Sequence, residues 1–274
     1  MSATDVRVAP ADTRSDTRLF PAVLRSELTK LRSVRSTVWA LLATIGITVG
    51  FGSLFCFAFT ARYDRLDPAE RLTRDPTMLS LRGVFLSSLA IGVLGVLVVT
   101  AEYATGMIRA TLTAVPQRRA VLAAKAVVFG GVALIVATGS AFAAFGAGQA
   151  ILARKHLGTS LSDPTVLRAV LGASAYLTLI GLLGLALGTI LRRTAGAIAT
   201  LVGLVFIADL LVEALPSPWN TDIGKFLPGN TGLALFTVRA NPDRLTPGAA
   251  LIVLIIWVAA SLVFATLTLT RRDA

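Results

Sequence analysis

Residues 166–191 read VLRAVLGASAYLTLIGLLGLALGTIL, an apolar run in which Arg168 is the only charged residue. A helix needs about 20 consecutive, mostly apolar residues to cross the hydrocarbon core of a bilayer. Five further runs approach or exceed that length, at 38–60, 84–101, 120–152, 195–215 and 248–270. The sequence therefore predicts a membrane protein with about six transmembrane helices.

The composition excludes a soluble protein. Hydrophobic residues make up 55% of the chain and charged residues 15%, and the mean hydropathy is +0.76. A soluble domain needs roughly a quarter of its residues charged. No run alternates in the manner of a strand, and lipid-exposed backbone must satisfy its hydrogen bonds internally. We therefore expect an all-α, polytopic bundle that forms one transmembrane domain over 21–274.

Two different segments precede the first run. Residues 1–20 are polar, so we expect a disordered tail. Residues 21–37 place leucines at helical spacing, which predicts an amphipathic helix that begins at Pro21 and lies in the membrane interface. A solvated cytoplasmic helix is the alternative. The apolar stripe consists of Leu24, Leu28, Leu31 and Val38, and the charged residues assigned to this interfacial helix are Glu27, Lys30, Arg32 and Arg35.

The distribution of lysine and arginine predicts the orientation, because basic residues gather on the cytoplasmic side of membrane proteins. With the N-terminus inside, 15 of the 26 basic residues fall in inside segments. We therefore expect a multi-pass protein of the cell membrane with both termini cytoplasmic, in contact with membrane lipids. The loop at 61–83 argues against this orientation, because it carries five arginines and would lie outside. The net charge of +11 fits anionic headgroups, and we expect no nucleic-acid partner.

Several catalytic chemistries are excluded by the residues that the chain lacks. Cys56 and His156 are the only cysteine and histidine, which leaves no intramolecular disulfide, cysteine metal site or histidine-based triad. The only Gly-Lys pair, Gly224-Lys225, is followed by Phe226 and does not form a phosphate-binding loop. We therefore expect no enzyme, no catalytic or metal-binding residue, and no cofactor bound by this chain.

Two glycine pairs have the spacing that lets transmembrane helices approach closely. Gly46 and Gly50 lie in the first run, and Gly184 and Gly188 lie in the fourth. Both pairs predict a packed bundle. Such pairs are common by chance in runs rich in glycine and alanine, so they predict no function.

The most informative stretch joins the second and third runs and reads EYATGMIRATLTAVPQRRAVLAAK over residues 102–125. It turns at Gly106, continues amphipathically and breaks at Pro116. A short cytoplasmic helix with charges at both ends is suited to docking a partner. An ordinary connector whose basic residues obey the positive-inside rule is the alternative, and the pattern alone does not separate the two.

The order of residues in this stretch resembles a known family. It contains Glu102-Tyr103-Ala104-Thr105-Gly106, Ile108-Arg109, Thr111-Leu112 and Pro116-Gln117-Arg118-Arg119. A similar order joins the second and third spans of ABC transporter permeases of the ABC-2 type. The run Ser26-Glu27-Leu28-Thr29-Lys30-Leu31-Arg32-Ser33 is similar to the opening of that family, and six helices with both ends inside also agree. The segments 61–83 and 216–247 match nothing in the family pattern.

The resemblance implies a division of labour. This chain would be the membrane-spanning permease subunit of an ATP-driven exporter. It would pair with a second permease, identical or related, and with two copies of a cytoplasmic ABC ATPase. ATP and Mg would bind that ATPase, whose closure would switch the access of the bundle. The ATPase would contact the interfacial helix and a coupling segment whose residues are Glu102, Gly106, Arg109, Thr111, Pro116, Arg118 and Arg119.

The resemblance also implies a role for each of four coupling residues. Glu102 would anchor the segment through an ion pair or a helix-end hydrogen bond, and Gly106 would permit a tight turn. Arg109 would contact the ATPase or Glu102. Pro116 would end the helix and set the angle of entry into the third span.

Two acidic residues lie in the fifth run. Asp209 and Glu213 are four residues apart and share one helix face. An ionisable side chain within a span is a functional candidate, because burying it in lipid is costly. A substrate path for a cationic substrate, an internal partner such as Lys225, and a plain interfacial position remain open. Two rival functions also remain: a secondary transporter driven by an ion gradient, and a membrane scaffold subunit that transports nothing.

Overall fold

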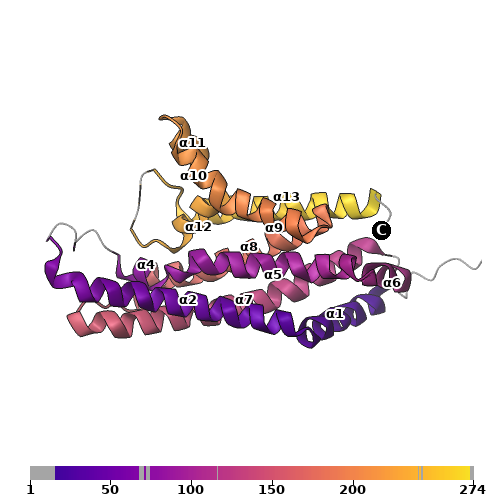
Figure 1. Ribbon diagram of the computed structural model, residues 1–274, viewed down its shortest axis with the longest axis horizontal. Coiled ribbons are helices and arrows are strands. Elements are labelled where there is room, and N and C mark those ends of the chain that lie inside the picture. The colour runs from indigo at the N-terminus through magenta and orange to yellow at the C-terminus, as the bar shows by residue number, and fades with distance from the viewer. Residues whose placement is uncertain are drawn as a thin grey trace, which may run out of the picture.

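The computed structural model describes residues 16–271, apart from 68–70, 72–74, 116, 240 and 242. Over these residues the chain is helical and contains no strand. Six helical segments are long and apolar enough to cross a membrane, which confirms the predicted polytopic all-α bundle (Figure 1). They are α2 Arg35–Arg62, α5 Gly83–Ala104, α7 Arg118–Leu152, α8 Pro164–Leu191, α9 Thr194–Val202 with its continuation η4 Gly203–Ile207 and α10 Ala208–Glu213, and α13 Pro247–Arg271.

Shorter helices gather at the two ends of this bundle (Figure 1). One end carries α1 and α6 together with the C-terminal end of α13, and we call it the α6 end. The opposite end carries α4, α11 and α12, and we call it the α12 end. The short elements are α1 Asp16–Ser33, η2 Tyr63–Arg65, α4 Pro76–Ser80, α6 Met107–Ala114, η3 Ala153–Lys155, α11 Trp219–Gly224 and α12 Pro228–Phe236.

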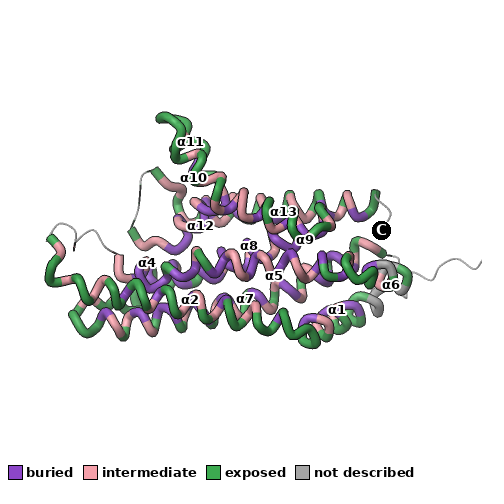
Figure 2. Tube along the Cα trace, in the orientation of Figure 1, coloured by how far each residue is buried: buried purple, intermediate pink, exposed green. Residues whose placement is uncertain are grey.

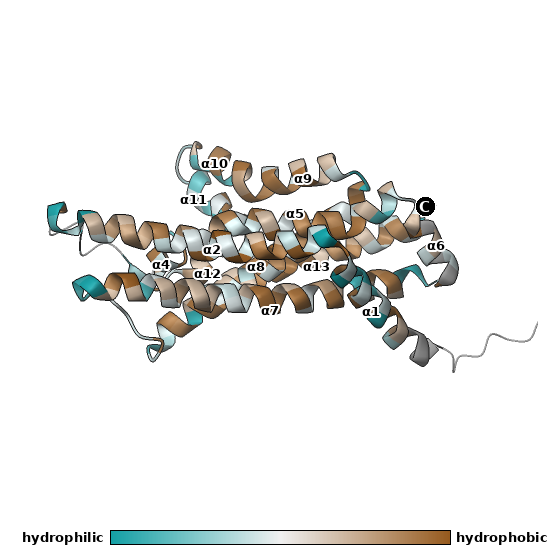
Figure 3. Cartoon of the chain, turned by 60° about the horizontal axis from the view of Figure 1, so that its bottom comes forward, coloured by the Kyte–Doolittle hydropathy of each residue, from teal (hydrophilic) through white to brown (hydrophobic). Residues whose placement is uncertain are grey.

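The core lies around α5 and α8. Of the most apolar stretch of each helix, 67% is buried in α8 and 56% in α5, against 22% in α2 and 17% in the α9 segment. Figure 2 shows the same contrast, with buried residues along the central helices and exposed residues along the outer ones. Figure 3 shows hydrophobic residues along the middle of the long helices and hydrophilic residues near their ends. The exposed apolar faces of the outer helices are suited to contact with lipid.

Helix α8 begins where the sequence offers a cap. Asp163 accepts hydrogen bonds from the backbone amide of Thr165 at 2.8 Å and from its hydroxyl at 2.7 Å, and Pro164 occupies the first turn. These donors satisfy a helix start and favour the ionised carboxylate. The Thr165 hydroxyl and amide therefore hold the pKa of Asp163 below its ordinary value.

The N-terminal helix differs from the prediction in two places. Helix α1 begins at Asp16, so residues 16–20 are helical and Pro21 lies inside the helix rather than at its start. The remaining part of the predicted disordered tail, 1–15, lies outside the described residues. Val34 adopts an extended conformation and separates α1 from α2. Val38 therefore belongs to α2, where it is exposed, rather than to the stripe of the interfacial helix.

Candidate functional site

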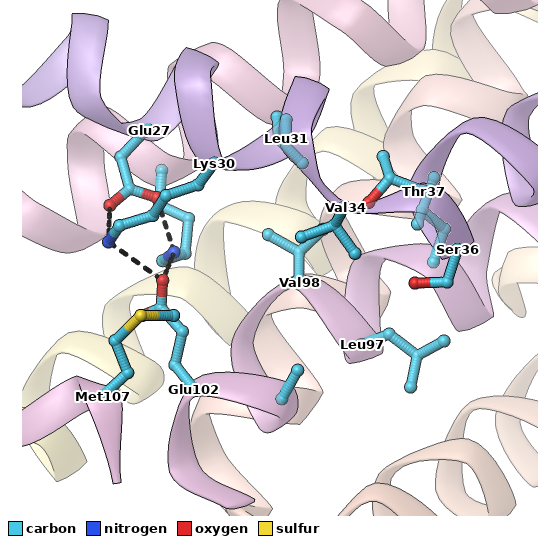
Figure 4. Close-up of a pocket in the computed structure, with 13 residues that line it drawn as sticks. Glu27, Lys30, Leu31, Val34, Ser36, Thr37, Leu97, Val98, Glu102 and Met107 are labelled. Carbon is cyan, nitrogen blue, oxygen red and sulfur yellow. Dashed lines mark hydrogen bonds and ion pairs between the residues drawn. The ribbon is translucent and has the colours of Figure 1, made fainter. Parts of the chain in front are cut away.

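Four charged side chains from three helices meet at the α6 end of the bundle (Figure 4). Glu27 and Lys30 come from α1, Glu102 from the last turn of α5, and Lys125 from near the start of α7. The Lys125 ammonium lies 2.6 Å from Glu27 Oε2 and 2.8 Å from Glu102 Oε1. The Lys30 ammonium lies 2.7 Å from Glu27 Oε1 and 3.0 Å from Glu102 Oε1. We call these four residues the charge cluster.

Three of the four members of the charge cluster are almost fully removed from solvent. Glu27 is 2% exposed, and Glu102 and Lys125 are each 4% exposed. A buried charge costs several kcal/mol unless it is paired and hydrogen-bonded. Two carboxylates and two ammoniums balance here, and Glu102 Oε1 accepts from both lysines. Glu102 Oε2 is buried without a hydrogen-bond partner among the described residues, so this carboxylate is only half satisfied.

Lys30 is the member of the cluster closest to the surface. Its partial burial alone would lower the pKa of the ammonium, but the hydrogen bond and charge of Glu27, together with those of Glu102, outweigh that effect. The pKa of Lys30 is therefore raised above its ordinary value. The same ammonium donates to Thr111 Oγ1 at 3.4 Å, which connects α6 to the cluster.

The local structure explains how these residues meet. Glu27 lies three residues after Leu24 and four before Leu31, so it shares the face by which α1 packs on α7. The ion pair between Glu27 and Lys125 bridges 98 residues of sequence. The charge cluster fastens α1, α5 and α7 to one another at one end of the bundle.

A small cavity of about 130 Å³ lies beside the charge cluster. Its other walls are mostly apolar and include Val34, Leu97, Val98 and Met107 (Figure 4). The four residues of the charge cluster line this cavity together with apolar residues of α5 and with the start of α2.

The structure describes most of the residues of the predicted coupling segment. The predicted turn at Gly106 is present, because this residue has a φ of 72° in the left-handed region and precedes α6. Thr111 accepts from Lys30. Arg118 donates to the backbone oxygen of Leu269 at 2.9 Å, which links the start of α7 to the end of α13.

The other coupling residues divide into one exposed residue and two that the structure does not describe in full. Arg119 is exposed in the first turn of α7. The side chain of Arg109 and the whole of Pro116 lie outside the described residues, so the roles predicted for them stay predictions. The ion pair expected for Glu102 is present, and it is formed with the lysines of the charge cluster.

The four charged residues assigned to the interfacial helix divide into an exposed pair and an inward pair. Arg32 and Arg35 are exposed, as an outward polar face requires, and Arg35 is the first residue of α2. Glu27 and Lys30 instead point inward to the charge cluster. The buried face of α1 thus combines apolar side chains with one paired acid, Glu27. Its spacing from Leu24 and Leu31 already places Glu27 on the apolar stripe.

Lys125 is a functional candidate that the sequence pattern does not single out, because it is one of several basic residues near the ends of the apolar runs. A signal was present, because an ionisable residue inside an apolar run needs a partner and Glu102 ends the neighbouring run. Only the packing of α5 against α7 identifies that partner.

Asp209 and Glu213 lie at the α12 end, in α10, far along the bundle from the charge cluster (Figure 1). Both line a polar cavity of about 330 Å³. Asp209 packs against the backbone of Gly229, and its Oδ1 is buried without a hydrogen-bond partner among the described residues. Lys225 pairs with Asp222 at 3.1 Å, so it is not the ion-pair partner of Asp209.

The described residues include no group of three His, Cys, Asp or Glu side chains able to hold a metal ion. Cys56 is buried, with its Sγ 3.5 Å from the Ser80 hydroxyl. No family model matches the chain, and no curated protein matches it either. The fold and the buried cluster thus define a multi-pass membrane protein whose N-terminal helix is fastened to its transmembrane bundle by ion pairs.

Proposed function

We propose that this chain is the membrane-spanning permease subunit of an ATP-driven exporter of the ABC-2 type, powered by a separate cytoplasmic ATPase. The observation that carries the proposal is the charge cluster, which joins α1 to α5 and α7 and reaches α6 through Thr111. A partner that moves α1 and α6 would therefore move two transmembrane helices with them, because separating the buried charges is costly.

The resemblance of residues 26–33 and 102–119 to this family supports the same assignment of parts. The α6 end would face the cytoplasm and receive two copies of the ATPase, and a second permease would cover part of the exposed apolar surface. The chain lacks a phosphate-binding loop, so ATP and Mg would bind the ATPase. Rigid helices would pass the closure of the ATPase pair to the bundle and switch its access.

The contact with the ATPase is tested at exposed residues of the α6 end. Reversing Glu102 would place three buried cations together and disrupt the fold, so it would not isolate coupling. Met107, which is 45% exposed, and Arg119 are better sites. We expect Met107→Glu and Arg119→Glu to release the ATPase during purification and to reduce ATP-driven transport at least tenfold, as disruption of central interface contacts does.

Arg154→Glu provides the matched control, because Arg154 is exposed at the α12 end. It should leave ATPase retention and transport unchanged. Copurification of tagged permease from its native membrane, followed by transport in vesicles with and without ATP, measures both quantities. Normal retention of the ATPase by both α6-end variants would disprove the coupling contact.

The orientation has its own test. In a Cys56→Ser background, single cysteines at Thr105 and Ser217 lie exposed at the α6 end and the α12 end respectively. The count of basic residues predicts a cytoplasmic α6 end. We therefore expect an impermeant thiol reagent to label Ser217→Cys in intact cells and Thr105→Cys only after the membrane is opened. The reverse labelling pattern would place the coupling segment outside and reject the proposal.

Asp209 favours a second candidate, a secondary transporter driven by an ion gradient. It is an acid within a candidate span that borders a polar cavity, a place where ion pathways are found. Transport by the purified chain along a proton or sodium gradient, without ATPase or ATP, would favour this candidate over the first. Absence of transport under either condition would favour a scaffold subunit.

A further inference from the structure

A second cavity, of about 500 Å³, lies at the α12 end between α2, α5 and α12. Four aromatic side chains line it: Phe51 and Phe55 from α2, Phe85 from α5 and Phe236 from α12. Two guanidinium groups also line it, Arg82 immediately before α5 and Arg244 in the segment before α13. The cavity therefore combines an apolar wall with a cationic rim.

The aromatic wall opens toward the surface that faces lipid. Phe51 is 40% exposed and Phe55 is 38% exposed, and Leu54 between them is 58% exposed. These residues lie on α2, which buries only 22% of its most apolar stretch. An acyl chain of the bilayer can therefore contact this wall.

The cationic rim lies at the level where the spans end. Arg82 precedes the first residue of α5, Gly83, and Arg244 lies three residues before Pro247, the first residue of α13. At such a level a guanidinium can meet a lipid headgroup while its stem follows apolar surface. The Arg82 guanidinium stacks over the Phe55 ring at 5.2 Å, which connects the rim to the aromatic wall.

Among the described residues, no acid within this cavity neutralises the rim. No described residue lining the cavity is acidic, and neither Arg82 nor Arg244 forms an ion pair there within 4.0 Å. The nearby carboxylate of Asp75 instead accepts from the backbone amides that start α4 and from the amide of Val238. Arg244 also lines the polar cavity that contains Asp209, Glu213 and Asp243, but among the described residues it forms no ion pair within 4.0 Å there.

A neighbouring cavity extends the positive charge. It shares Arg244, has a volume of about 350 Å³ and is lined by Arg168 and Arg239 as well. Arg168 donates to the backbone oxygens of Leu235 and Thr237, so it is held in place by α12 and the residue that follows it. The described residues that line this neighbouring cavity also include no acid.

We propose that the cavity between α2, α5 and α12 binds one anionic phospholipid of the surrounding bilayer. Arg82 and Arg244 hold its phosphate, because a planar guanidinium matches two phosphate oxygens. Phe51, Phe55 and Phe85 pack against the first part of an acyl chain. This proposal rests on the membrane fold alone and is independent of transport or of any ATPase.

The test compares lipid binding by the purified chain in detergent, measured by native mass spectrometry. The probes are phosphatidylglycerol and phosphatidylcholine with identical chains, and glycerol phosphate as a free headgroup. We expect the chain to bind phosphatidylglycerol in preference to both others. Each arginine near a headgroup contributes about fivefold in affinity, so Arg82→Gln with Arg244→Gln should reduce phosphatidylglycerol binding by more than tenfold.

Three further variants make the result decisive. Arg82→Lys with Arg244→Lys should retain much of the preference for the anionic lipid, and Phe55→Ala should weaken binding of both lipids. Arg154→Gln removes an exposed arginine at the same end, outside the cavity, and should change nothing. An equal loss in Arg154→Gln, unchanged binding in the double glutamine variant, or glycerol phosphate binding as tightly as phosphatidylglycerol would each overturn the proposal. A helical circular dichroism spectrum and a single elution peak verify the fold of every variant.

Discussion

Replacing Lys125 with methionine is expected to lower the free energy of unfolding by about 3–5 kcal/mol, because it leaves two buried carboxylates facing each other with one remaining cation. The Lys125 ammonium lies within 2.8 Å of both Glu27 and Glu102. Methionine occupies a similar volume without charge, so lost packing contributes little. Reversible unfolding in mixed micelles of a mild detergent and SDS measures the change.

Two control variants show whether the cost of Lys125→Met arises from the burial of the unpaired charge. Lys155 forms an ion pair of 2.7 Å with Asp64, but both side chains are well exposed, so Lys155→Met should cost less than about 1 kcal/mol. Adding Glu27→Met to Lys125→Met removes one charge of each sign and should restore most of the loss, because Lys30 and Glu102 can still pair. Equal costs for the two lysines would show that the charge cluster is not desolvated.

The second large effect is expected at the contact between α5 and α8. A Cβ at Gly184 would overlap the backbone oxygen of Gly92, and one at Gly95 would overlap the backbone oxygen of Gly181. The two helices therefore touch through their backbones. We expect Gly184→Ala to cost about 1–3 kcal/mol by overpacking, and Gly184→Leu to prevent a stable fold.

Gly50 supplies the matched control for this contact. A Cβ at Gly50 meets no atom within 4 Å, so Gly50→Ala should be neutral or slightly stabilising, since alanine favours a helix over glycine. Unfolding in mixed micelles and the elution profile of each variant report the result. A Gly184→Ala protein as stable as Gly50→Ala would mean that α5 and α8 can separate at no cost.

The glycine pairs show which part of a helix contact can be predicted from sequence. Gly46 with Gly50 and Gly184 with Gly188 share one spacing, and both pairs predicted close helix contacts. The structure places Gly184 and Gly188 against α5 and leaves Gly46 and Gly50 in open space. Spacing specifies only that two glycines share a helix face. Which face meets a neighbour depends on the rotation of the whole helix.

The six spans were predictable because the length and polarity of each run are local properties that the bilayer selects directly. The predicted bounds agree with the helices to within a few residues. The turn at Gly106 was also predictable, since a residue without a Cβ adopts a left-handed φ at little cost. The start of α1 was not, because proline favours the first helical position, whereas Pro21 lies inside this helix, which begins at Asp16.

The sequence by itself determined the class of protein: an all-α chain that crosses a membrane about six times, with a charged amphipathic helix before the first span. The tertiary structure alone decided which charges meet. Glu27, Glu102 and Lys125 are separated by 23 to 98 residues. The local sequence around each does not distinguish it from other charged residues near the ends of the spans. Their pairing depends on the break at Val34 that lets α1 pack on α7, and long-range packing of this kind leaves no signature in local composition or periodicity.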